Sequence, residues 1–357
     1  MTVRAPSQAT KVANKAAKLA KVARNAASAQ VAELPTVKKR ATVGGDWRPL
    51  PLPTGERLSL RLTLASGQSF RWQETDTGYW CCVLKNRLYT LRQQEDIHYR
   101  VYSPSTAPAN TVKEQNAAQQ TLIAHLRLDV DFTQRLHCWS AADANFARCL
   151  VESAATTEGV RVLRLDPVEA LVSFICSSNN HVGRISMMVQ RLCTELGDCI
   201  GHVGEQPMHA FPALAALAQP DAEAKMRAWG FGYRARFLRE TARMIVEERP
   251  GGEDWLRALS QRPYREAKEE LLRFPGIGPK VADCICLFGL DMSEAVPVDT
   301  HLWRVAQRDY GLGGGAKRGG QEARALTGHL YDAVGDCLRD RFGNEAGWAH
   351  SVCFTAT

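Results

Sequence analysis

The sequence of 357 residues contains no apolar run that approaches the roughly 18 residues of a membrane-spanning helix. This absence excludes an ordinary transmembrane protein, and we expect no membrane partner. We find no secretory signal either, so the eleven cysteines are expected to be reduced thiols in a cytosolic, nuclear or mitochondrial compartment rather than a disulfide framework. A chain of this length can bury a full core in one or two domains.

Acidic side chains are almost absent from residues 1–45, which hold nine Lys/Arg and only Glu33, a net charge of +8. Residues 46–357 carry 36 basic and 37 acidic side chains, so the body of the protein is nearly neutral. The Ala/Lys-rich composition suits a nuclear localisation signal, a mitochondrial presequence or a solvated arm that contacts phosphates. We predict a disordered basic tail over 1–45 and a nuclear location, with a mitochondrial share also open. Any DNA contact by the body must come from a local patch or from backbone amides.

The residues from Asp46 onward have the pattern of β-strands. The segments YWCCVL and RLYTLRQ flank Lys85-Asn86 and predict a hairpin, and IHYRVY predicts a further strand. We expect an antiparallel β domain over 46–121, with a loop at 103–120. Four leucines at every second position also predict a half-buried strand: Leu58, Leu60, Leu62 and Leu64.

Beyond this loop the sequence is almost entirely helical in character, and we predict an α-helical domain over 122–357. Asp166 as cap, Pro167 at the first helical position and Glu169 at the third predict the start of one helix. The segment EAKEELLRF, the turn PGIGP and the segment KVADCICLFGL predict a helix-hairpin-helix at about 265–290.

The hairpin turn contains Gly276 and Gly278, which leave backbone N–H groups open to a phosphate beside the positive end of the second helix. A Walker A loop is excluded because its glycine spacing before GK[ST] is absent. A turn of this kind followed by a surface lysine also occurs as an ordinary helical connection. The hairpin alone therefore predicts DNA binding only weakly.

Lys280 and Asp299 raise the question of nucleophilic chemistry. A lysine attacks only as the neutral amine, which desolvation and a helix N-terminus favour. Asp299 would favour the ammonium if it paired closely with Lys280, so its more useful role is to stabilise positive charge that develops on a substrate. It can also simply cap the helix THLWRVAQR, and the two roles can coexist.

Five separated motifs, in order, resemble the eukaryotic 8-oxoguanine DNA glycosylase/AP lyase family of the helix-hairpin-helix glycosylase superfamily. They are SGQSFRW, SFICSSNN, GFGYRAR, PGIGPKVADCICL with AVPVDTHLW, and GWAHSVCF. The resemblance runs from about Asp46 to the C-terminus and leaves out the tail and the 103–120 loop. It implies an α+β fold in which an antiparallel β domain packs on a two-lobed α-helical domain, with the cleft between the lobes facing DNA.

The resemblance also implies a function. A flipped 8-oxoguanine opposite cytosine is excised from duplex DNA by Lys280 attack at C1′, and the resulting Schiff base permits β-elimination. Asp299 stabilises the oxocarbenium-like sugar. No metal or other cofactor is required, and we expect a monomer. The implied binding residues are Gly67, Cys284, His350 and Phe354 for the lesion base, Asn179, Arg184 and Arg234 for cytosine, Tyr233 as wedge, and Gly276, Gly278 and His301 for phosphates.

Two residues depart from the pattern of the family. His181 replaces a third Asn after SSNN, and His350 replaces a Gln that reads the Watson-Crick edge of the damaged base. A protonated His350 would place its own N–H donors against the N1–H and N2–H donors of the damaged base. We therefore expect activity to fall as pH drops through roughly 6.5.

Two alternatives remain at this point. A non-catalytic helix-hairpin-helix DNA-binding protein would need neither Lys280 nor Asp299. An enzyme of the endonuclease III or adenine glycosylase type would carry four closely spaced cysteines for an iron–sulfur cluster, whereas here only Cys337 and Cys353 follow Cys286.

Overall fold

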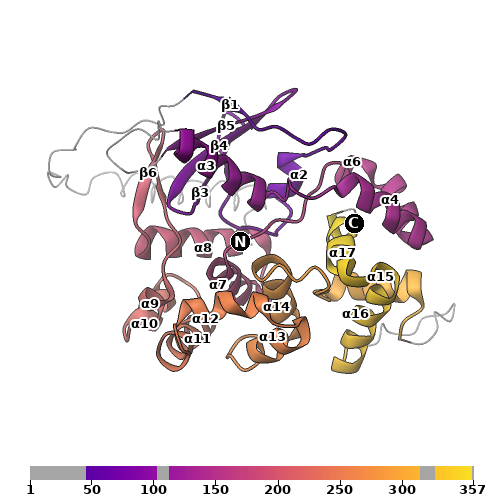
Figure 1. Cartoon of the computed structure of the whole chain (residues 1–357). Helices are drawn as coiled ribbons and strands as arrows, with labels where there is room; N and C mark the ends of the chain where they lie inside the picture. The colour runs from indigo at the N-terminus through magenta and orange to yellow at the C-terminus, as the bar shows by residue number, and fades with distance from the viewer. Residues whose placement is uncertain (1–45, 103–111, 314–325, 356–357) are drawn as a thin grey trace, which may run out of the picture. The chain divides into compact units, whose positions relative to one another are not determined.

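The computed structural model describes residues 46–102, 112–313 and 326–355, without the side chains of residues 353–355. The predicted basic tail and residues 103–111 of the predicted loop lie outside this range. Figure 1 shows an antiparallel sheet followed along the chain by helices, which confirms the predicted α+β fold class. No helix in the described ranges is long and apolar enough to cross a membrane.

The main sheet has five antiparallel strands among the described residues, in the order β1-β5-β4-β3-β2. Lys85 and Asn86 have φ angles of 46° and 57°, the mirror-image turn that matches strand twist in a tight hairpin. The predicted hairpin and the strand after it are therefore confirmed. The strands are β1 (Arg48–Pro49), β2 (Gln73–Glu74), β3 (Trp80–Leu84), β4 (Arg87–Gln93) and β5 (Ile97–Tyr102).

The predicted leucine strand is wrong, because Leu60–Leu64 forms the short helix α2. Ser59 caps this helix by accepting a hydrogen bond from the Leu62 N–H at 3.3 Å. Leu60, Thr63 and Leu64 are buried, which is the spacing of one helical face. Over so few residues, an alternating pattern also fits one helical turn, and the cap at Ser59 decides between them.

The predicted loop at 103–120 is wrong from residue 112 onward, because helix α3 spans Val112–His125. This helix packs on the sheet (Figure 1), where the Tyr89 hydroxyl donates to the Ala118 carbonyl at 3.3 Å and Leu122 is fully buried. Its polar, Ala/Gln-rich sequence carries only a narrow apolar stripe, so the sequence pattern resembles that of a loop.

A second hairpin, β6 (Cys199–Val203) with β7 (Gln206–His209), interrupts the region that was predicted as helical. Ile200 and Met208 pack against Val83 and Leu88 of the main sheet. Gly and Pro in CIGHVGEQPMH hide the alternation that would have predicted these strands.

The helix-hairpin-helix is confirmed as α13 (Tyr264–Leu271) and α14 (Pro279–Cys284), which continues as the π-helix η3 (Ile285–Gly289). Helix α7 (Pro167–Ser177) begins as predicted, with Asp166 accepting from the Val168 N–H at 2.9 Å. A continuous hydrophobic core joins the sheet, α7, the hairpin and the C-terminal helices.

The other helices lie on either side of α7 in the sequence. They are α4 (Phe132–Ala142), α5 (Ala144–Glu152), α6 (Ala154–Thr157), α8 (Val182–Leu196), α9 (Leu214–Leu217), α10 (Ala222–Ala228), α11 (Arg234–Glu248), α12 (Glu253–Ala258), η2 (Leu259–Gln261), α15 (Thr300–Tyr310), α16 (Gly328–Phe342), η4 (Gly343–Glu345) and α17 (Ala346–Thr355).

Candidate active site

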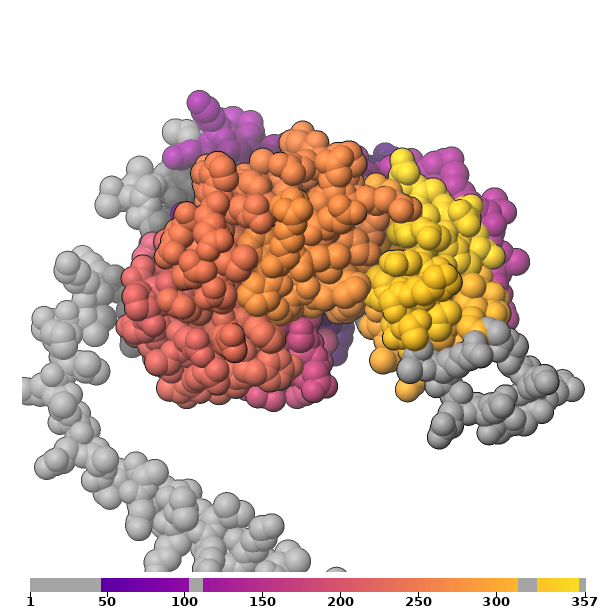
Figure 2. Space-filling view, turned by 90° about the horizontal axis from the view of Figure 1, so that it is seen from below, coloured from indigo at the N-terminus to yellow at the C-terminus, as the bar shows by residue number. Residues whose placement is uncertain are grey.

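A cavity of about 340 Å³ brings together five of the predicted site residues, and it is also lined by His181, one of the two departures from the family pattern. Its lining comes from the segment before β2, from α7, α8 and the turn between them, from the hairpin helix and η3, from the residues that lead into α15, and from the middle of α17. Figure 2 shows the surface hollowed between the orange hairpin helices and the yellow C-terminal helices. The five predicted residues in its lining are Gly67, Lys280, Cys284, Asp299 and His350.

Lys280 lies in the first turn of α14, directly after Pro279 at the first helical position. This placement follows from the sequence, because proline is pre-organised for a helix start and the glycines before it allow the tight turn. The Lys280 Nζ lies 5.7 Å from the centroid of the Phe174 ring, and the residue is only partly exposed. The amine thus faces the cavity from a rigid helix start beside an aromatic wall.

Asp299 caps helix α15. Its Oδ1 atom accepts hydrogen bonds from the backbone N–H groups of His301 at 2.9 Å and Leu302 at 2.8 Å. The same carboxylate also lines the cavity that Lys280 enters. The capping role considered from the sequence is therefore real, and it fixes the carboxylate at the cavity wall.

Gly67 has a φ of 80°, a conformation that residues with a Cβ adopt only with strain. A Cβ added there would lie 3.2 Å from the Cγ2 atom of Val182, the first residue of α8. The following residue, Gln68, is buried and anchors this turn: its Nε2 donates to the Arg161 carbonyl at 2.9 Å and its Oε1 accepts from the Leu163 N–H at 2.8 Å. The backbone at Gly67 is thus presented to the cavity in a fixed position.

Burial controls the two titratable groups deepest in the cavity. It raises the pKa of the Cys284 thiol to about 11, against the opposing effect of the Lys280 ammonium. It lowers the pKa of the His350 imidazole to about 4, where the Asp299 charge opposes the shift and Lys280 and His301 add to it. At neutral pH the cavity therefore holds a neutral thiol and a neutral imidazole. The expectation that His350 protonates near pH 6.5 is wrong for this reason.

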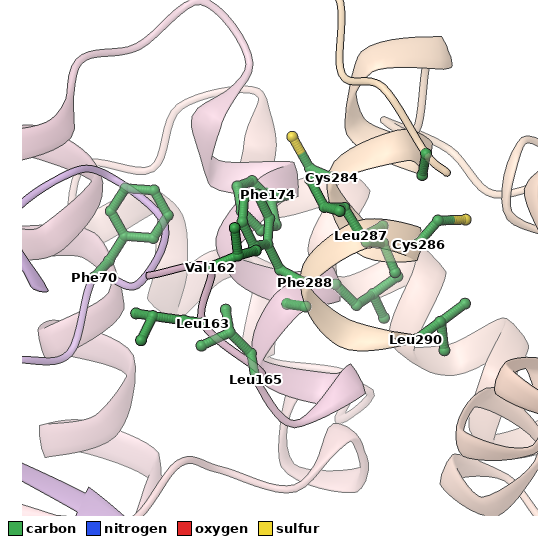
Figure 3. Close-up of a cluster of buried hydrophobic side chains, with 14 of the residues drawn as sticks. Phe70, Val162, Leu163, Leu165, Phe174, Cys284, Cys286, Leu287, Phe288 and Leu290 are labelled. Atoms are coloured by element: carbon green, nitrogen blue, oxygen red, sulfur yellow. The ribbon is translucent and has the colours of Figure 1, made fainter. Parts of the chain in front are cut away.

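Three phenylalanines form an apolar wall that was not singled out from the sequence. Phe174 stacks on Phe288 with ring centroids 5.4 Å apart and meets Phe70 edge-on at 5.9 Å. Figure 3 shows Phe174 between Phe70 and the helix that carries Cys284. Phe70 and Phe174 lie inside the motifs SGQSFRW and SFICSSNN, so the family resemblance could have indicated them. The sequence pattern alone could not, because an aromatic side chain beside an apolar run looks the same when it only fills the hydrophobic core.

Two of the residues predicted to read the opposite base, Asn179 and Arg234, meet at one turn. The Arg234 guanidinium, only 3% exposed, donates to the Ser178 carbonyl through Nε at 3.1 Å and to the Asn179 carbonyl at 2.9 Å. A further Arg234 N–H and the Tyr233 hydroxyl also donate to the Ser178 carbonyl. The Arg184 guanidinium donates to the Gly230 carbonyl at 3.3 Å. These side chains cluster as a second group beside the cavity, and their roles stay predictions.

Tyr233 is 46% exposed, which is unusual for a large aromatic side chain. Asn179 is exposed in the left-handed conformation, with a φ of 48°. His181, one of the two departures from the family pattern, is the N-cap of α8 and accepts from the Arg184 N–H at 3.4 Å. The departure therefore sits in the turn that holds Arg184.

The hairpin turn is held against helix α11. Gly276 has a φ of 82°, and a Cβ there would lie 2.7 Å from the Phe237 side chain. The Thr241 hydroxyl donates to the Pro275 carbonyl at 3.0 Å. Gly278 is the N-cap of α14, with no atom within 4 Å of an added Cβ. The open side of the turn thus starts at Gly278.

The last two predicted residues, His301 and Phe354, are also not among the described lining of the first cavity. His301 lies in the first turn of α15 and lines a neighbouring cavity of about 130 Å³, which His350 also borders. Phe354 lies near the end of α17, and its side chain is beyond the described part of the chain. Among the described residues, no group of three or more His, Cys, Asp or Glu side chains is arranged to hold a metal ion.

Comparison with known proteins connects this site to a family. Residues 50–171 match the family described as 8-oxoguanine DNA glycosylase, N-terminal domain, and residues 172–327 match the HhH-GPD superfamily of base excision DNA repair proteins. The N-glycosylase/DNA lyase OGG1 of Arabidopsis thaliana is 36% identical over 315 residues, which cover 87% of this chain and 80% of the plant protein. The N-glycosylase/DNA lyase of Saccharomyces cerevisiae is 33% identical over 324 residues, or 84% of this chain and 83% of the yeast protein.

Solved structures agree with this result. The apo crystal structure of Clostridium acetobutylicum 8-oxoguanine glycosylase/lyase has a TM-score of 0.68 and 25% sequence identity to this chain. The match covers 85% of this chain and 94% of the bacterial chain. The two proteins therefore share a fold that combines the antiparallel sheet with the helical region.

Proposed function

Since the chain belongs to the 8-oxoguanine N-glycosylase/DNA lyase family, we propose that it excises 8-oxoguanine opposite cytosine from duplex DNA, with Lys280 as the nucleophile. The observation that supports this role is the meeting of Lys280, Asp299 and Gly67 in one cavity. The substrate base must leave the helical stack to enter such a cavity, at a cost of a few kcal/mol.

The reaction begins when the neutral Lys280 amine attacks C1′ of the flipped nucleotide. The bond from C1′ to N9 breaks, and the base departs with the bonding electron pair and takes up a proton. The attacking nitrogen loses its proton, the sugar ring opens, and a Schiff base forms between Nζ and C1′. Loss of a proton from C2′ then expels the 3′ phosphate by β-elimination, which accounts for the lyase step.

Asp299 stabilises the positive charge that develops on the sugar as the C1′ to N9 bond breaks. The two backbone N–H groups that hold its Oδ1 atom fix the carboxylate before the reaction, so the protein does not reorganise as the charge appears. Such pre-organised electrostatic groups contribute about 3 to 4 kcal/mol each to transition-state stabilisation.

Discrimination between the lesion and guanine needs a single acceptor, because N7 carries a hydrogen only in 8-oxoguanine. The carbonyl of Gly67 provides this acceptor, and the anchoring of Gln68 holds it in place. Cys284 packs against the flipped base as a neutral thiol. His350, neutral above about pH 4, offers one acceptor and one donor to the Watson-Crick edge.

The hairpin and the second cluster engage the rest of the duplex. The backbone N–H groups of Gly276 and Gly278, at the positive end of α14, bind a phosphate. Arg184 and the Nη1 group of Arg234 present donors to cytosine, while the Nε and Nη2 groups of Arg234 hold the turn at Ser178 and Asn179. Asn179 presents an amide, and Tyr233 occupies the gap in the stack. The protein acts as a monomer. Residues 1–45 direct most of it to the nucleus and a part of it to mitochondria. The cellular distribution of a fluorescent fusion protein, with and without residues 1–45, tests this localisation.

Borohydride trapping on an 8-oxoguanine:cytosine duplex tests the nucleophile. Lys280→Gln is expected to bind lesion DNA but to lose both base excision and the trapped covalent adduct. Lys225→Gln is the control, because Lys225 is an exposed lysine paired with Asp221 on α10. Trapping of Lys280→Gln at the level of the control would move the nucleophile elsewhere. Absence of any trapping by the unmodified protein would favour a non-catalytic DNA-binding module.

Cleavage of duplexes that place 8-oxoguanine opposite each of the four bases tests the substrate. Preference for cytosine is expected, and equal cleavage opposite all four would remove the assigned role of the Arg184 and Arg234 cluster.

A further inference from the structure

Asp283 is a fully buried carboxylate on α14, three residues after Lys280. Its Oδ1 atom accepts a hydrogen bond from the Tyr264 hydroxyl at 2.6 Å. Its Oδ2 atom accepts from the Tyr331 hydroxyl at 2.5 Å and from the Lys268 Nζ at 2.9 Å. Tyr264 and Lys268 belong to α13, the other helix of the hairpin, whereas Tyr331 belongs to α16. A buried carboxylate with three donors thus joins three helices.

Tyr331 is the member of this network that reaches toward Asp299. Its hydroxyl donates to Asp283, with the Val296 carbonyl as a second and more distant acceptor at 3.4 Å, and it accepts a hydrogen bond from the Val298 N–H at 3.2 Å. Val298 is the residue directly before Asp299. A path of two hydrogen bonds therefore runs from the helix of Lys280 to the backbone that carries Asp299. Tyr264 makes an equally short bond to Asp283, but its hydroxyl leads back to Lys268 at 3.2 Å, within α13.

The segment that Tyr331 contacts packs in the core through Ala295, Val296 and Val298, but it has no regular backbone pairing. Residues 295–299 belong to no helix or strand, so no ladder of backbone hydrogen bonds fixes them. The cap at Asp299 fixes the carboxylate relative to α15, whereas the Tyr331 contact fixes the same stretch relative to α14. The second contact is therefore a polar link between the helix of Lys280 and the segment that carries Asp299.

We propose that Tyr331, oriented by Asp283, is a positioning residue that sets the place of Asp299 relative to Lys280. The inference rests on the proposed roles of those two residues. Lys268 and Tyr264 complete the shell around Asp283 and keep it in place as an acceptor. A displacement of about 1 Å between reacting groups can lower a rate by about a hundredfold, so loss of the Tyr331 hydroxyl acts on the chemical step.

The variants Tyr331→Phe and Tyr264→Phe form a matched pair. Both side chains are buried, at 6% and 7% exposure, and each variant removes one hydroxyl that donates to Asp283. Only Tyr331→Phe also removes the acceptor for the Val298 N–H. The measurement is the single-turnover excision rate at saturating enzyme, divided by the fraction of molecules that borohydride can trap, with lesion-DNA affinity and melting temperature measured alongside.

We expect Tyr331→Phe to lower this rate by about ten- to a hundredfold, with lesion-DNA affinity nearly unchanged. Tyr264→Phe should stay within about threefold of the unmodified protein, although both variants lose similar thermal stability. A purely structural role would lower the trappable fraction of both variants and leave the rate per trappable molecule unchanged. Equal rates in the two variants would overturn the proposal.

Hydrogen exchange of the Val298 amide gives a second readout, which does not depend on enzymatic activity. In the unmodified protein we expect this amide to be protected from exchange. It should exchange faster in Tyr331→Phe, whereas its exchange rate in Tyr264→Phe should match that of the unmodified protein. Exchange at the rate of an open amide in the unmodified protein would also overturn the proposal. Failure of the proposed function is distinguishable, because it would appear as continued trapping by Lys280→Gln.

Discussion

The Asp299 carboxylate accepts the backbone N–H of Leu302 at 2.8 Å through the same oxygen atom that accepts the N–H of His301. One oxygen thus caps α15, while the charge of the group remains available to the cavity. Asp299 can therefore cap the helix and stabilise positive charge at the same time. The two roles can be tested separately, because an asparagine amide can cap a helix but carries no charge.

Asp299→Asn is therefore expected to keep the cap and lose the electrostatic role. Excision should fall by about a hundredfold or more, while the free energy of unfolding changes by less than about 1 kcal/mol. Asp299→Ala should show the same loss of activity and an additional loss of about 1 kcal/mol in stability. Single-turnover rates and urea unfolding check both variants. Full activity in Asp299→Asn would show that Asp299 only caps the helix.

His350→Gln tests the protonation state of the imidazole. Because burial lowers the pKa of His350 to about 4, the imidazole stays neutral between about pH 5.5 and pH 7.5. The ratio of single-turnover excision rates at these two pH values should therefore be the same in the unmodified protein and in His350→Gln. A clearly less acid-sensitive glutamine variant would mean that His350 takes up a proton in this range.

The same shift predicts a difference in stability. The folded state binds the proton of His350 less readily than the unfolded state, whose pKa is near 6.5, so stability is lost as pH falls from about 6.5 toward 4. The unmodified protein should lose about 2 to 3 kcal/mol more than His350→Gln over this interval. Urea unfolding at several pH values measures the difference. Parallel curves for the two proteins would contradict the burial of this imidazole.

Arg184→His is expected to relax the preference for cytosine. Each good base contact contributes about 1 to 3 kcal/mol of discrimination, so the ratio of cleavage opposite cytosine to cleavage opposite adenine should fall by about five- to 150-fold. Arg191→His is the control, because Arg191 lies on the same helix, is exposed, and pairs with Glu195 at 2.9 Å. An equal loss opposite all four bases would indicate that Arg184 contacts only the backbone of the DNA.

The two hairpin glycines should respond differently to alanine. Gly276→Ala meets Phe237 at 2.7 Å in a positive-φ conformation, so it should destabilise the hairpin by about 1 to 2 kcal/mol and weaken binding to duplexes without a lesion. Gly278→Ala has open space and an extended backbone, so it should cost less than about 1 kcal/mol. Fluorescence anisotropy and thermal unfolding measure both effects. Equal binding losses would mean that the loss does not arise from the turn conformation at Gly276.

The sequence predicted elements whose signal is local. The Lys85-Asn86 turn, the Asp166 cap and the PGIGP hairpin each depend on a few adjacent residues with special backbone preferences, and the structure contains all three. Helix α2 was not predicted, because the cap at Ser59 outweighs the alternating leucine pattern. The β6–β7 hairpin was not predicted either, because it is stabilised by packing against Val83 and Leu88 despite its glycines.

The candidate site was predictable in part for a different reason. Lys280 and Asp299 follow turns that fix their backbone, so motif order was enough to select them. The apolar wall formed by Phe174 and Phe288 and the link from Asp283 through Tyr331 to Val298 join residues far apart in sequence. Single positions carry no signal for such contacts, because a buried tyrosine or phenylalanine looks the same whether it supports a site or only fills the core.

The Ser178 carbonyl receives more donors than an oxygen atom with two lone pairs can satisfy fully. Two come from the Arg234 guanidinium and one from the exposed hydroxyl of Tyr233. When the Tyr233 ring turns toward a partner, the oxygen remains saturated by Arg234, so the departure leaves no unsatisfied group behind. The hydroxyl contact of Tyr233 is thus inexpensive to break, whereas its ring also meets Phe237 edge-on at 5.7 Å and lies 4.6 Å from the Arg234 Cζ atom. The turn at Ser178 and Asn179 is held by Arg234 whether or not the Tyr233 hydroxyl contact is made.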